Sequence, residues 1–248
     1  MLKCGIGMAT VNVSKVPRHV GIILDGNRRF AKRLMLKPWM GHEWGAKKVE
    51  KLGEWCKDLG VKELTLYAFS VQNFERPKIE FDYLMDLFKK EFNALMNDAE
   101  KWKTINENKI RINFIGRIWM FPEGVKNAMY ALMEKTKDHK EHIINFAMAY
   151  GGREEVVDAV KKLAEDIKSG KVNVEQINEE VFAKNLYMES EPQLIIRTGG
   201  EKRTSNFLIW QSHYSEWVFL EKFWPEFEKE DLVACIEEYN NRQRRFGK

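Results

Sequence analysis

Five consecutive residues, Asp25 to Arg29, bring together groups that bind phosphate and magnesium. Asp25 supplies a carboxylate, and Mg²⁺ in proteins usually takes one or two carboxylates together with substrate phosphates and water. Arg28 and Arg29 supply guanidinium forks, which hold phosphate oxygens two at a time. Gly26 allows a positive φ and a close approach of the backbone to a ligand. The same residues are also compatible with a turn that has a solvated basic flank, so this segment alone leaves both interpretations open.

Similar groups of polar residues follow other segments that we predict to be buried strands. Val20 to Leu24, just before Asp25, is an apolar run of strand length. The polar groups that follow later runs are Ser70, Asn73 and Arg76; Gly151 to Arg153; and Arg197 to Gly200. Because ligands of a parallel α/β sheet bind beyond the carboxyl ends of its strands, we expect these groups to converge on one rim. Several arginines around one carboxylate would make that rim a diphosphate site.

The alternation of predicted strands and helices indicates an α/β fold. We expect a single domain over residues 17–248, with a mostly parallel six-stranded central sheet flanked by helices, after a loose lead-in over residues 1–16. The predicted strands lie at residues 20–24, 64–69, 110–114, 143–149, 194–196 and 217–220. The predicted helices lie at residues 30–36, 46–59, 78–101, from 122, 156–167 with Gly170 as its stop, 174–186, 205–211 and from 229.

The predicted helix over residues 78–101 has a wider apolar surface than a surface helix needs. Phe81, Met85, Phe92 and Met96 broaden its apolar face. These side chains could form one wall of an apolar channel, and they could equally fill the core.

Composition excludes several classes of protein. The 248 residues carry a formal net charge of +4, which suits an anionic small substrate or a membrane surface but is too small for a nucleic-acid binder. Cys4, Cys56 and Cys235 are isolated, which favours a reducing compartment over a zinc site or a disulfide framework. No apolar run has the length of a membrane span. We therefore predict a cytoplasmic protein, at most peripheral at a membrane surface, with no nucleic-acid partner.

Taken together, these segments resemble the cis-prenyltransferases, the family that includes undecaprenyl diphosphate synthase. The similarity extends in register from Pro17 to Gly247. The residues that carry it are His19 to Phe30; Tyr67 to Ser70 with Asn73, Phe74, Arg76 and Pro77; Tyr150 to Arg153; Ile196 to Glu201; Arg203 with Ser205 to Phe207; and Arg242 to Gly247. The sequence contains neither of the usual glycine-rich nucleotide-binding motifs and no nucleophile elbow, so no competing motif is present.

The resemblance implies two diphosphate sites at the rim, each with its own residues. An allylic diphosphate would be held by Gly26, Asn27, Arg28, Arg29, Phe30 and His42. Isopentenyl diphosphate would be held by Arg197, Arg203, Thr204 and Ser205. Further substrate contacts would come from Ser70, Val71, Gln72, Phe74 and Arg76.

The resemblance also implies catalytic, metal-binding and dimer residues. Asp25 would bind Mg²⁺ and be the residue on which the chemistry depends most, with Glu216 as a second metal ligand. Asn73 would act at the reacting end of the substrate, either in proton transfer or as a hydrogen-bonding group. The family forms dimers, and Arg245 and Gly247 match a tail motif that reaches a neighbouring active site.

The implied reaction is the Mg²⁺-dependent condensation of isopentenyl diphosphate onto an allylic primer, farnesyl or geranylgeranyl diphosphate, with formation of cis double bonds. Its product is a long-chain polyprenyl diphosphate, such as a glycosyl-carrier lipid precursor. Two alternatives remain within the family: a non-catalytic binding or regulatory subunit, and a prenyltransferase that uses a different isoprenyl acceptor. A non-catalytic member is expected to lose the carboxylate or the arginines, and this chain keeps both.

Two positions depart from the family pattern. Pro38 stands where the family usually has an arginine, four residues before His42, and Lys37 is the neighbour that could supply the charge. Lys202, just before Arg203, stands at a position that is often histidine. Of the two, the change at Pro38 bears more directly on how the diphosphate of the primer is held.

Overall fold

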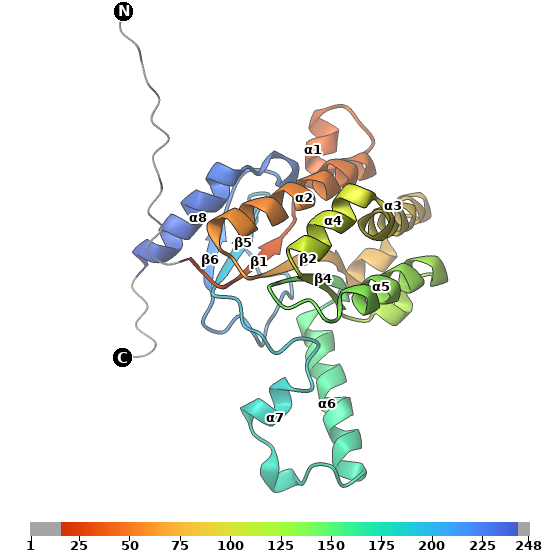
Figure 1. The fold of residues 1–248 in the computed structure, drawn as a ribbon, viewed down its shortest axis with the longest axis vertical. Coiled ribbons are helices and arrows are strands. Elements are labelled where there is room, and N and C mark those ends of the chain that lie inside the picture. Colours follow the sequence, from red (N-terminus) through yellow and green to blue (C-terminus); the bar gives the residue numbers. More distant parts are fainter. Residues whose placement is uncertain (1–15, 243–248) are drawn as a thin grey trace, which may run out of the picture.

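The computed structural model describes residues 16–242 (Figure 1). Six strands form one sheet in the order β3-β4-β2-β1-β5-β6, and every neighbouring pair is parallel. The strands are β1 (His19–Ile23), β2 (Glu63–Ser70), β3 (Ile110–Ile115), β4 (His142–Tyr150), β5 (Leu194–Arg197) and β6 (Glu216–Phe219). The predicted α/β fold with a six-stranded sheet is confirmed, and the sheet is parallel throughout.

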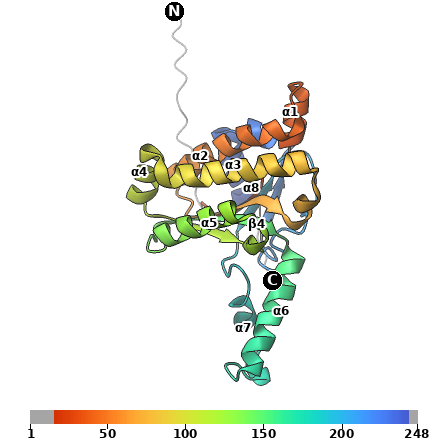
Figure 2. The same ribbon diagram turned by 90° about the vertical axis from the view of Figure 1, so that its right-hand side faces the viewer.

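Helices cover the sheet and extend beyond it. The α-helices of the described residues are α1 (Asn27–Arg33), α2 (Gly41–Leu59), α3 (Lys78–Asn97), α4 (Ala99–Glu107), α5 (Glu123–Thr136), α6 (Gly152–Lys168), α7 (Glu179–Ala183) and α8 (Lys229–Asn241). Single 3₁₀ turns occur at η1 (Pro38–Met40), η2 (Val71–Glu75), η3 (Ile118–Met120), η4 (Val174–Gln176) and η5 (Trp224–Glu226). Figures 1 and 2 show α6 and α7 extending away from the layered body as an arm.

The main core lies between the sheet and one layer of helices. Apolar residues of α2, α3, α5 and α8 form a single cluster with alternate residues of the strands. Val20 and Ile22 of β1 belong to this cluster, whereas Ile23 belongs to a smaller cluster on the other face. This division follows from the alternation of side chains along a strand. All of β1 is buried, as expected of a central strand in a parallel sheet.

The helix predicted over residues 78–101 is two helices, α3 and α4. Asp98 between them has extended dihedral angles, and its carboxylate accepts hydrogen bonds from the backbone N–H groups of Glu100 and Lys101, both at 3.0 Å. Because Asp satisfies the free N–H groups at a helix start, it ends one helix and begins the next. The apolar periodicity continued across this cap and concealed it.

Two further helix predictions were wrong in part. The helix predicted over residues 174–186 is η4 followed by the short α7. Asn178 caps the start of α7, because its side chain accepts from the Val181 N–H. Residues 205–211 form turns, because Ser205, Asn206 and Leu208 have positive φ angles that a right-handed helix does not allow.

Two predictions concern residues beyond the described range. Of the proposed lead-in, residues 1–15 lie outside the described residues, as do Arg245 and Gly247 of the predicted dimer motif. Within residues 16–242, no helix combines the length and the apolar character needed to cross a membrane.

Candidate active site

Asp25 lies just beyond the carboxyl end of β1, where contacts from two other segments hold its backbone. Its carbonyl oxygen accepts hydrogen bonds from the Trp224 backbone N–H at 2.9 Å and from the Thr198 hydroxyl at 2.8 Å. Gly26 follows with a φ of 106°, and a Cβ there would lie 2.8 Å from the side chain of Phe223. The turn therefore requires glycine. These contacts fix Asp25 at the rim of the sheet.

Two guanidinium groups hold the Asp25 carboxylate. Its Oδ1 accepts a hydrogen bond from Arg29 Nη2 at 3.0 Å, and its Oδ2 accepts one from Arg197 Nη2 at 2.9 Å. The Arg197 side chain is 3% exposed, whereas that of Asp25 is 30% exposed. A carboxylate oxygen can accept more than one hydrogen bond or ligand. The exposed side of Asp25 is therefore available to a cation.

Arg197, the last residue of β5, links Asp25 to the loop that follows. Its Nη1 donates to Ser205 Oγ at 2.8 Å and to the backbone carbonyl of Arg203. The Tyr67 hydroxyl donates to the carbonyl of Ser205 at 3.3 Å and so supports the same loop. Among the described residues, Arg197 Nε is buried and has no hydrogen-bond partner. A buried donor without a partner favours a site that a ligand or water completes.

A second charged cluster consists of Arg28, His42, Arg76 and Glu80. Glu80 is 2% exposed, and its Oε1 accepts from Arg76 Nη1 at 2.7 Å. Arg28 Nε lies 3.6 Å from the same oxygen. Glu80 therefore sits beneath two guanidinium groups and holds them in place. The Arg76–Glu80 pair is far less exposed to solvent than an ordinary surface ion pair, whereas the Arg28 side chain is 49% exposed.

His42 is neutral in this cluster and serves as a hydrogen-bonding group. Its Nε2 lies 3.2 Å from Arg76 Nη1. A guanidinium can only donate, so Nε2 is the acceptor and the ring carries its proton on Nδ1. Burial, followed by the charges of Arg76 and Arg28, lowers the pKa of His42 to about 3. His42 can therefore donate from Nδ1 to an anion over the whole neutral pH range.

We expect the free energy of unfolding to fall as the pH drops from about 6.5 toward about 3. The unfolded chain binds a proton at His42 near pH 6.5, whereas the folded protein binds it only near pH 3, so acid favours unfolding. His19, whose pKa is lowered to about 4 mainly by burial, acts in the same direction. Urea unfolding at pH 4.5 and 7.5 measures the effect. His42→Gln should reduce the difference by roughly 1–3 kcal/mol, and the exposed His213→Gln should not. An equal pH dependence in His42→Gln would contradict the assignment.

Replacing Glu80 with glutamine is expected to raise the KM for an anionic substrate held by Arg28 and Arg76 about tenfold. The amide keeps the shape of the side chain but removes the charge that holds Arg76 and Arg28, so both guanidinium groups lose their fixed positions. Steady-state kinetics with each substrate varied in turn measures the effect. The matched control is Asp82→Asn on the same helix, where the carboxylate pairs with exposed Lys78. Equal KM values for Glu80→Gln and Asp82→Asn would show that Glu80 has no positioning role.

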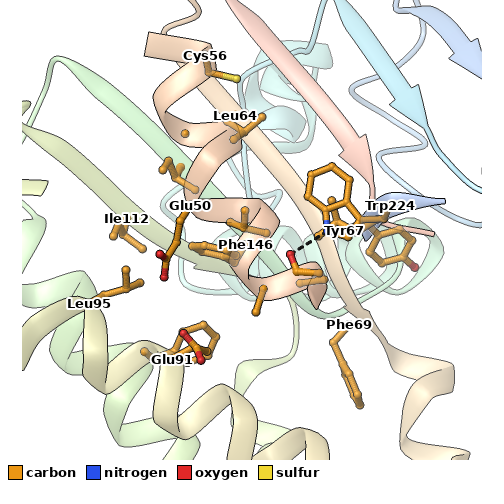
Figure 3. Close-up of a pocket in the computed structure, with 18 of the residues that line it drawn as sticks. Glu50, Cys56, Leu64, Tyr67, Phe69, Glu91, Leu95, Ile112, Phe146 and Trp224 are labelled. Carbon is orange, nitrogen blue, oxygen red and sulfur yellow. Dashed lines mark hydrogen bonds between the residues drawn. The ribbon is translucent and has the colours of Figure 1, made fainter. Parts of the chain in front are cut away.

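Two cavities meet at Asp25. The first, which we call the anion basin, is about 420 Å³ and has cationic side chains from Arg28, Arg29, Lys32, Arg76 and Arg203. The second, which we call the apolar channel, is about 430 Å³ and lies between α2, α3 and the sheet (Figure 3). The residues that line both are Leu24, Asp25, Asn27, His42 and Arg76. A cationic basin joined to an apolar channel fits a ligand with an anionic head and an apolar tail.

The predicted channel wall was right in its helix and largely wrong in its side chains. Of the four predicted residues, Phe92 lines the channel, whereas Phe81, Met85 and Met96 pack in or against the core. The α3 residues with apolar side chains that line the channel are Leu87, Phe88, Phe92 and Leu95. Phe81, Met85 and Met96 therefore fill the core, which was the other interpretation of this apolar face.

Most predicted site residues come together at the two cavities. Those that line one or both are Asp25, Gly26, Asn27, Arg28, Arg29, His42, Ser70, Asn73, Arg76, Arg197 and Arg203. Asn73 Oδ1 accepts a hydrogen bond from the Ser70 backbone N–H at 3.1 Å, which leaves the Nδ2 donor for a ligand. This arrangement favours a hydrogen-bonding role for Asn73 over proton transfer.

Other predicted contact residues line neither cavity. They are Phe30, Val71, Gln72, Phe74, Thr204 and Ser205. Phe30 packs edge-on against Trp44, and Phe74 packs edge-on against Phe69. Gln72 donates to Glu154 at 3.5 Å. Within this chain Phe30 and Phe74 contribute to packing, and Ser205 contacts Arg197.

The structure does not bring Glu216 to Asp25 within one chain. Glu216 is the first residue of β6 and pairs in register with Leu194, which in turn pairs with Val20. Asp25 lies five residues beyond Val20 in the direction of β1, and each residue of a strand adds about 3.3 Å along the strand. The two carboxylates therefore lie near opposite ends of the strands, Glu216 at the amino ends and Asp25 at the carboxyl ends. Glu216 accepts a hydrogen bond from Arg242 Nη1 at 2.8 Å.

The substitution at Pro38 is not compensated by its neighbour. Pro38 begins η1, and the Lys37 ammonium lies 5.6 Å from the centre of the Trp39 ring. Neither Lys37 nor Lys202 lines the anion basin, whereas Lys32 of α1 does.

Three side chains of the site were not predicted: Glu80, Glu201 and Phe223. Glu201 lies 3.7 Å from Arg29 Nη1, and the Phe223 ring lies 5.3 Å from the guanidinium carbon of Arg29. The spacing of four residues from Arg76 to Glu80 is a helical ion-pair signal that could have identified Glu80. No local pattern indicates Phe223, because its contact with α1 joins distant parts of the sequence.

Asp25 fits a magnesium ion that is shared with a substrate. Within residues 16–242, no group of three or more His, Cys, Asp or Glu side chains could form a metal site by itself. Mg²⁺ does not require such a cage, since it keeps waters and takes phosphate oxygens alongside one or two carboxylates. The exposed carboxylate of Asp25, in a basin that attracts phosphate, meets this requirement.

Comparisons with known proteins agree with the geometry. The model of the family described as "Putative undecaprenyl diphosphate synthase" matches residues 23–247. The chain is 47% identical over 240 residues to the tritrans,polycis-undecaprenyl-diphosphate synthase (geranylgeranyl-diphosphate specific) of Methanopyrus kandleri, covering 96% of this chain and 87% of the relative. It is 45% identical over 242 residues to the enzyme of the same name from Methanocaldococcus jannaschii, covering 96% and 85%.

A solved structure shares the fold. The crystal structure of lavandulyl diphosphate synthase from Lavandula x intermedia, in complex with dimethylallyl diphosphate, superposes with a TM-score of 0.84 at 32% identity. The match covers 94% of this chain and 98% of that one. Family match, identity and fold agree: the chain belongs to the undecaprenyl diphosphate synthase family and is a cis-prenyltransferase.

Proposed function

We propose that this enzyme condenses isopentenyl diphosphate repeatedly onto an allylic diphosphate, with Mg²⁺ as cofactor, to make a long-chain polyprenyl diphosphate with cis double bonds. The observation that carries the proposal is the junction of the anion basin and the apolar channel at Asp25. A prenyl diphosphate has the same two parts, an anionic head and an apolar tail. The basin takes the head, the channel takes the tail, and the bond that breaks lies between them.

Several residues around the basin bind the diphosphate of the allylic substrate. Arg28, Arg29 and Arg76 hold the diphosphate, and His42 donates from Nδ1. Breaking the allylic carbon–oxygen bond places negative charge on the departing diphosphate, and fixed donors stabilise that charge without having to reorganise. Asp25 would hold Mg²⁺, which would neutralise part of the same charge.

Arg197 and Arg203 hold the second diphosphate, that of isopentenyl diphosphate. Arg197 Nε is a buried donor without a partner among the described residues, beside the carboxylate of Asp25. A second substrate fixed at this point has its double bond oriented toward the allylic carbon, which is catalysis by positioning. Asn73 donates from Nδ2 at the reacting end.

We infer that geranylgeranyl diphosphate is the primer, because both archaeal relatives are named as specific for it. The test is incubation of the protein with labelled isopentenyl diphosphate, Mg²⁺ and, in separate reactions, geranyl, farnesyl or geranylgeranyl diphosphate. We expect the highest rate with geranylgeranyl diphosphate and a polyprenyl diphosphate of long chain by mass spectrometry. Absence of any extractable polyprenyl product with all three primers would refute the proposed reaction.

A different acceptor is the second candidate. The lavandulyl diphosphate synthase shares the fold and was solved with dimethylallyl diphosphate bound. The same reactions with dimethylallyl diphosphate as both donor and acceptor distinguish the two functions. A branched ten-carbon product in place of chain elongation would favour the second candidate.

We also propose that the enzyme is a cytoplasmic homodimer whose tail residues Arg245 and Gly247 serve the neighbouring active site. The buried free thiols of Cys56 and Cys235 suit a reducing compartment. Under this proposal, Glu216 contributes to metal binding only across the dimer. Light scattering measures the assembly, and a mixing experiment tests the tail. An inactive Asp25→Asn chain should restore activity to a chain that lacks residues 243–248, and failure to do so would contradict the shared site.

A further inference from the structure

The loop after β5 carries Arg203 and Ser205, and its backbone is strained. Ser205, Asn206 and Leu208 have φ angles of 50°, 64° and 45°, in the left-handed region that residues other than glycine rarely adopt. Such angles persist only where surrounding contacts hold them, and they gather at sites where a fixed geometry serves function. Arg197 holds one side of this loop through Ser205 Oγ and the Arg203 carbonyl. The other side of the loop contacts the start of α6.

Asn206 joins the loop to the first turn of α6. Its backbone carbonyl accepts a hydrogen bond from the Gly152 N–H at 2.7 Å, and its side-chain Oδ1 accepts one from the Arg153 N–H at 2.8 Å. The residue before the helix, Gly151, has no side chain that could accept from these groups. Asn206 therefore caps α6 from a segment 53 residues away in the sequence.

Glu154, in the same turn of α6, contacts the other end of the Asn206 amide. Glu154 Oε2 accepts a hydrogen bond from Asn206 Nδ2 at 2.8 Å. The orientation of the amide is fixed, because a carboxylate can only accept and the Arg153 N–H can only donate. A Cβ at Gly151 would collide with Glu154 Oε2 and lie 2.7 Å from Asn206 Nδ2. The contact between Asn206 and Glu154 therefore requires the glycine beside it.

The second oxygen of Glu154 faces η2, on another side of the active site. Glu154 Oε1 accepts a hydrogen bond from Gln72 Nε2 at 3.5 Å. Gln72 directly precedes Asn73, which lines the apolar channel. One carboxylate therefore joins two segments that follow different strands, β2 and β5. We call Asn206, Glu154 and Gln72 the loop bridge.

Tyr67 of β2 contacts the same loop beside the loop bridge. Its hydroxyl donates to the carbonyl of Ser205 at 3.3 Å, and its ring stacks on Phe207 with 4.9 Å between the ring centres. Burial, and then the charge of Glu154, raises the pKa of the Tyr67 hydroxyl, so this group stays a donor at neutral pH. Tyr67 therefore holds the backbone at Ser205, and the loop bridge holds it one residue later, at Asn206.

We propose that the loop bridge positions Arg203 for the diphosphate of isopentenyl diphosphate. Its members are positioning residues and not catalytic ones, because they act through the loop that carries Arg203 and line neither cavity. The strained backbone of the loop has its fixed geometry only while Asn206 keeps its contacts with α6. The inference rests on the proposed function, which assigns this diphosphate to Arg197 and Arg203.

The test removes one hydrogen bond of the loop bridge and then restores it in reverse. Asn206→Asp keeps the acceptor for the Arg153 N–H but turns a carboxylate oxygen toward Glu154, where a donor is needed. Glu154→Gln can accept from only one of its two partners, and its NH₂ group faces the other. In the double variant the new glutamine donates to the new aspartate and still accepts from Gln72. Every contact of the loop bridge is then formed again.

We expect each single variant to raise the KM for isopentenyl diphosphate about tenfold, and the double variant to return it to within about twofold of the unchanged enzyme. The kcat and the KM for the allylic primer should change less than about twofold in all three, because the loop bridge acts on a group that binds the second substrate. Steady-state kinetics with labelled isopentenyl diphosphate, Mg²⁺ and geranylgeranyl diphosphate measures these values.

Two comparisons distinguish the loop bridge from charge and from general loss of structure. Glu154→Gln removes a negative charge near a diphosphate site, so charge alone would lower the KM that the loop bridge predicts to rise. Asn178→Asp is the matched control, since Asn178 caps α7 by accepting from the Val181 N–H at 2.9 Å and lines neither cavity. The same chemical change there should leave the KM unchanged. Urea unfolding shows which variants fold, and Glu154→Gln with the double variant completes the test if Asn206→Asp does not fold.

The outcomes separate this inference from the proposed function. An unchanged or lower KM in Glu154→Gln, or a KM that stays raised in the double variant, would overturn the loop bridge while elongation leaves the proposed function standing. An equal rise in Asn178→Asp would also overturn it, since the effect would then come from any helix cap. Absence of elongation in the unchanged enzyme would overturn both.

Discussion

Replacing Asp25 with asparagine is expected to lower the rate of isopentenyl diphosphate incorporation by about 10³-fold. The amide keeps the size of the side chain but loses the charge that would bind Mg²⁺ under the proposed function. It also replaces one acceptor oxygen with an NH₂ group, which then faces Arg29 or Arg197 in place of a carboxylate oxygen. Because the lost interactions stabilise charge that develops as the allylic bond breaks, the defect should lie mainly in kcat.

The measurement is the initial rate with labelled isopentenyl diphosphate across a series of Mg²⁺ concentrations. Raising Mg²⁺ should not restore the rate of Asp25→Asn. The matched control is Asp158→Asn, which removes the charge from a second aspartate that pairs with an arginine, Arg117, at 2.8 Å. Asp158 lines neither cavity, so its loss should reduce stability and leave kcat unchanged. Full activity of Asp25→Asn would remove Asp25 from the mechanism.

The second large effect is expected at Arg197, where lysine should lower kcat/KM for isopentenyl diphosphate about 100-fold. Arg197 contacts Asp25 through Nη2 and the loop at Ser205 through Nη1, so one side chain fixes two parts of the site. A lysine ammonium is a single point charge and cannot span both contacts. Ser205 would then lose its donor, and the loop that carries Arg203 would lose its anchor. We also expect the free energy of unfolding to fall by about 1–3 kcal/mol, since buried acceptors are left without donors.

Arg117→Lys separates the loss of stability from the loss of function. Arg117 makes two hydrogen bonds to Asp158, at 2.8 and 2.9 Å, and lines neither cavity. Its replacement should destabilise the protein to a similar extent, as measured by urea unfolding, without changing kcat/KM. If Arg197→Lys lost no more activity than Arg117→Lys, Arg197 would be structural only.

The residues that gather at the candidate site could be predicted from the sequence because they lie at or after strand ends. Asp25 comes directly after an apolar run and before a glycine that must adopt a positive φ, and the structure has both features. Arg76 comes after β2 and η2, and Arg197 is the last residue of β5. In a parallel sheet the carboxyl ends of all strands lie on the same side. The convergence of these residues therefore follows from the alternation of strands and helices along the chain.

Contacts between distant segments could not be predicted in this way. Phe223 beneath Arg29 depends on how the segment after β6 packs on α1. The course of the channel depends on which apolar side chains of α3 face the sheet, and helical periodicity alone does not distinguish a channel wall from a core. Phe92 lines the channel and Met85 fills the core, although both belong to the same broad apolar face.

A single polar residue also sets a helix boundary that the apolar periodicity did not reveal. Asp98 starts α4 by accepting two hydrogen bonds from the backbone N–H groups of its first turn, while the apolar pattern continues on both sides of it. A cap contributes its energy at a single residue, so a pattern averaged over a helix does not detect it. The cap also determines a contact between distant residues, because the helix that it starts places Lys101 beside Glu50.

The amino-acid sequence by itself determined the α/β fold, the parallel sheet and the gathering of charged groups at the carboxyl ends of the strands. These properties depend on short-range patterns: apolar runs, turn residues and their alternation with helices. Only the tertiary structure decided that Glu216 lies at the opposite end of the strands from Asp25, that Glu80 holds two arginines, and that Lys101 pairs with Glu50 and Glu91. Those properties depend on strand register and helix packing, which join residues that no local pattern connects.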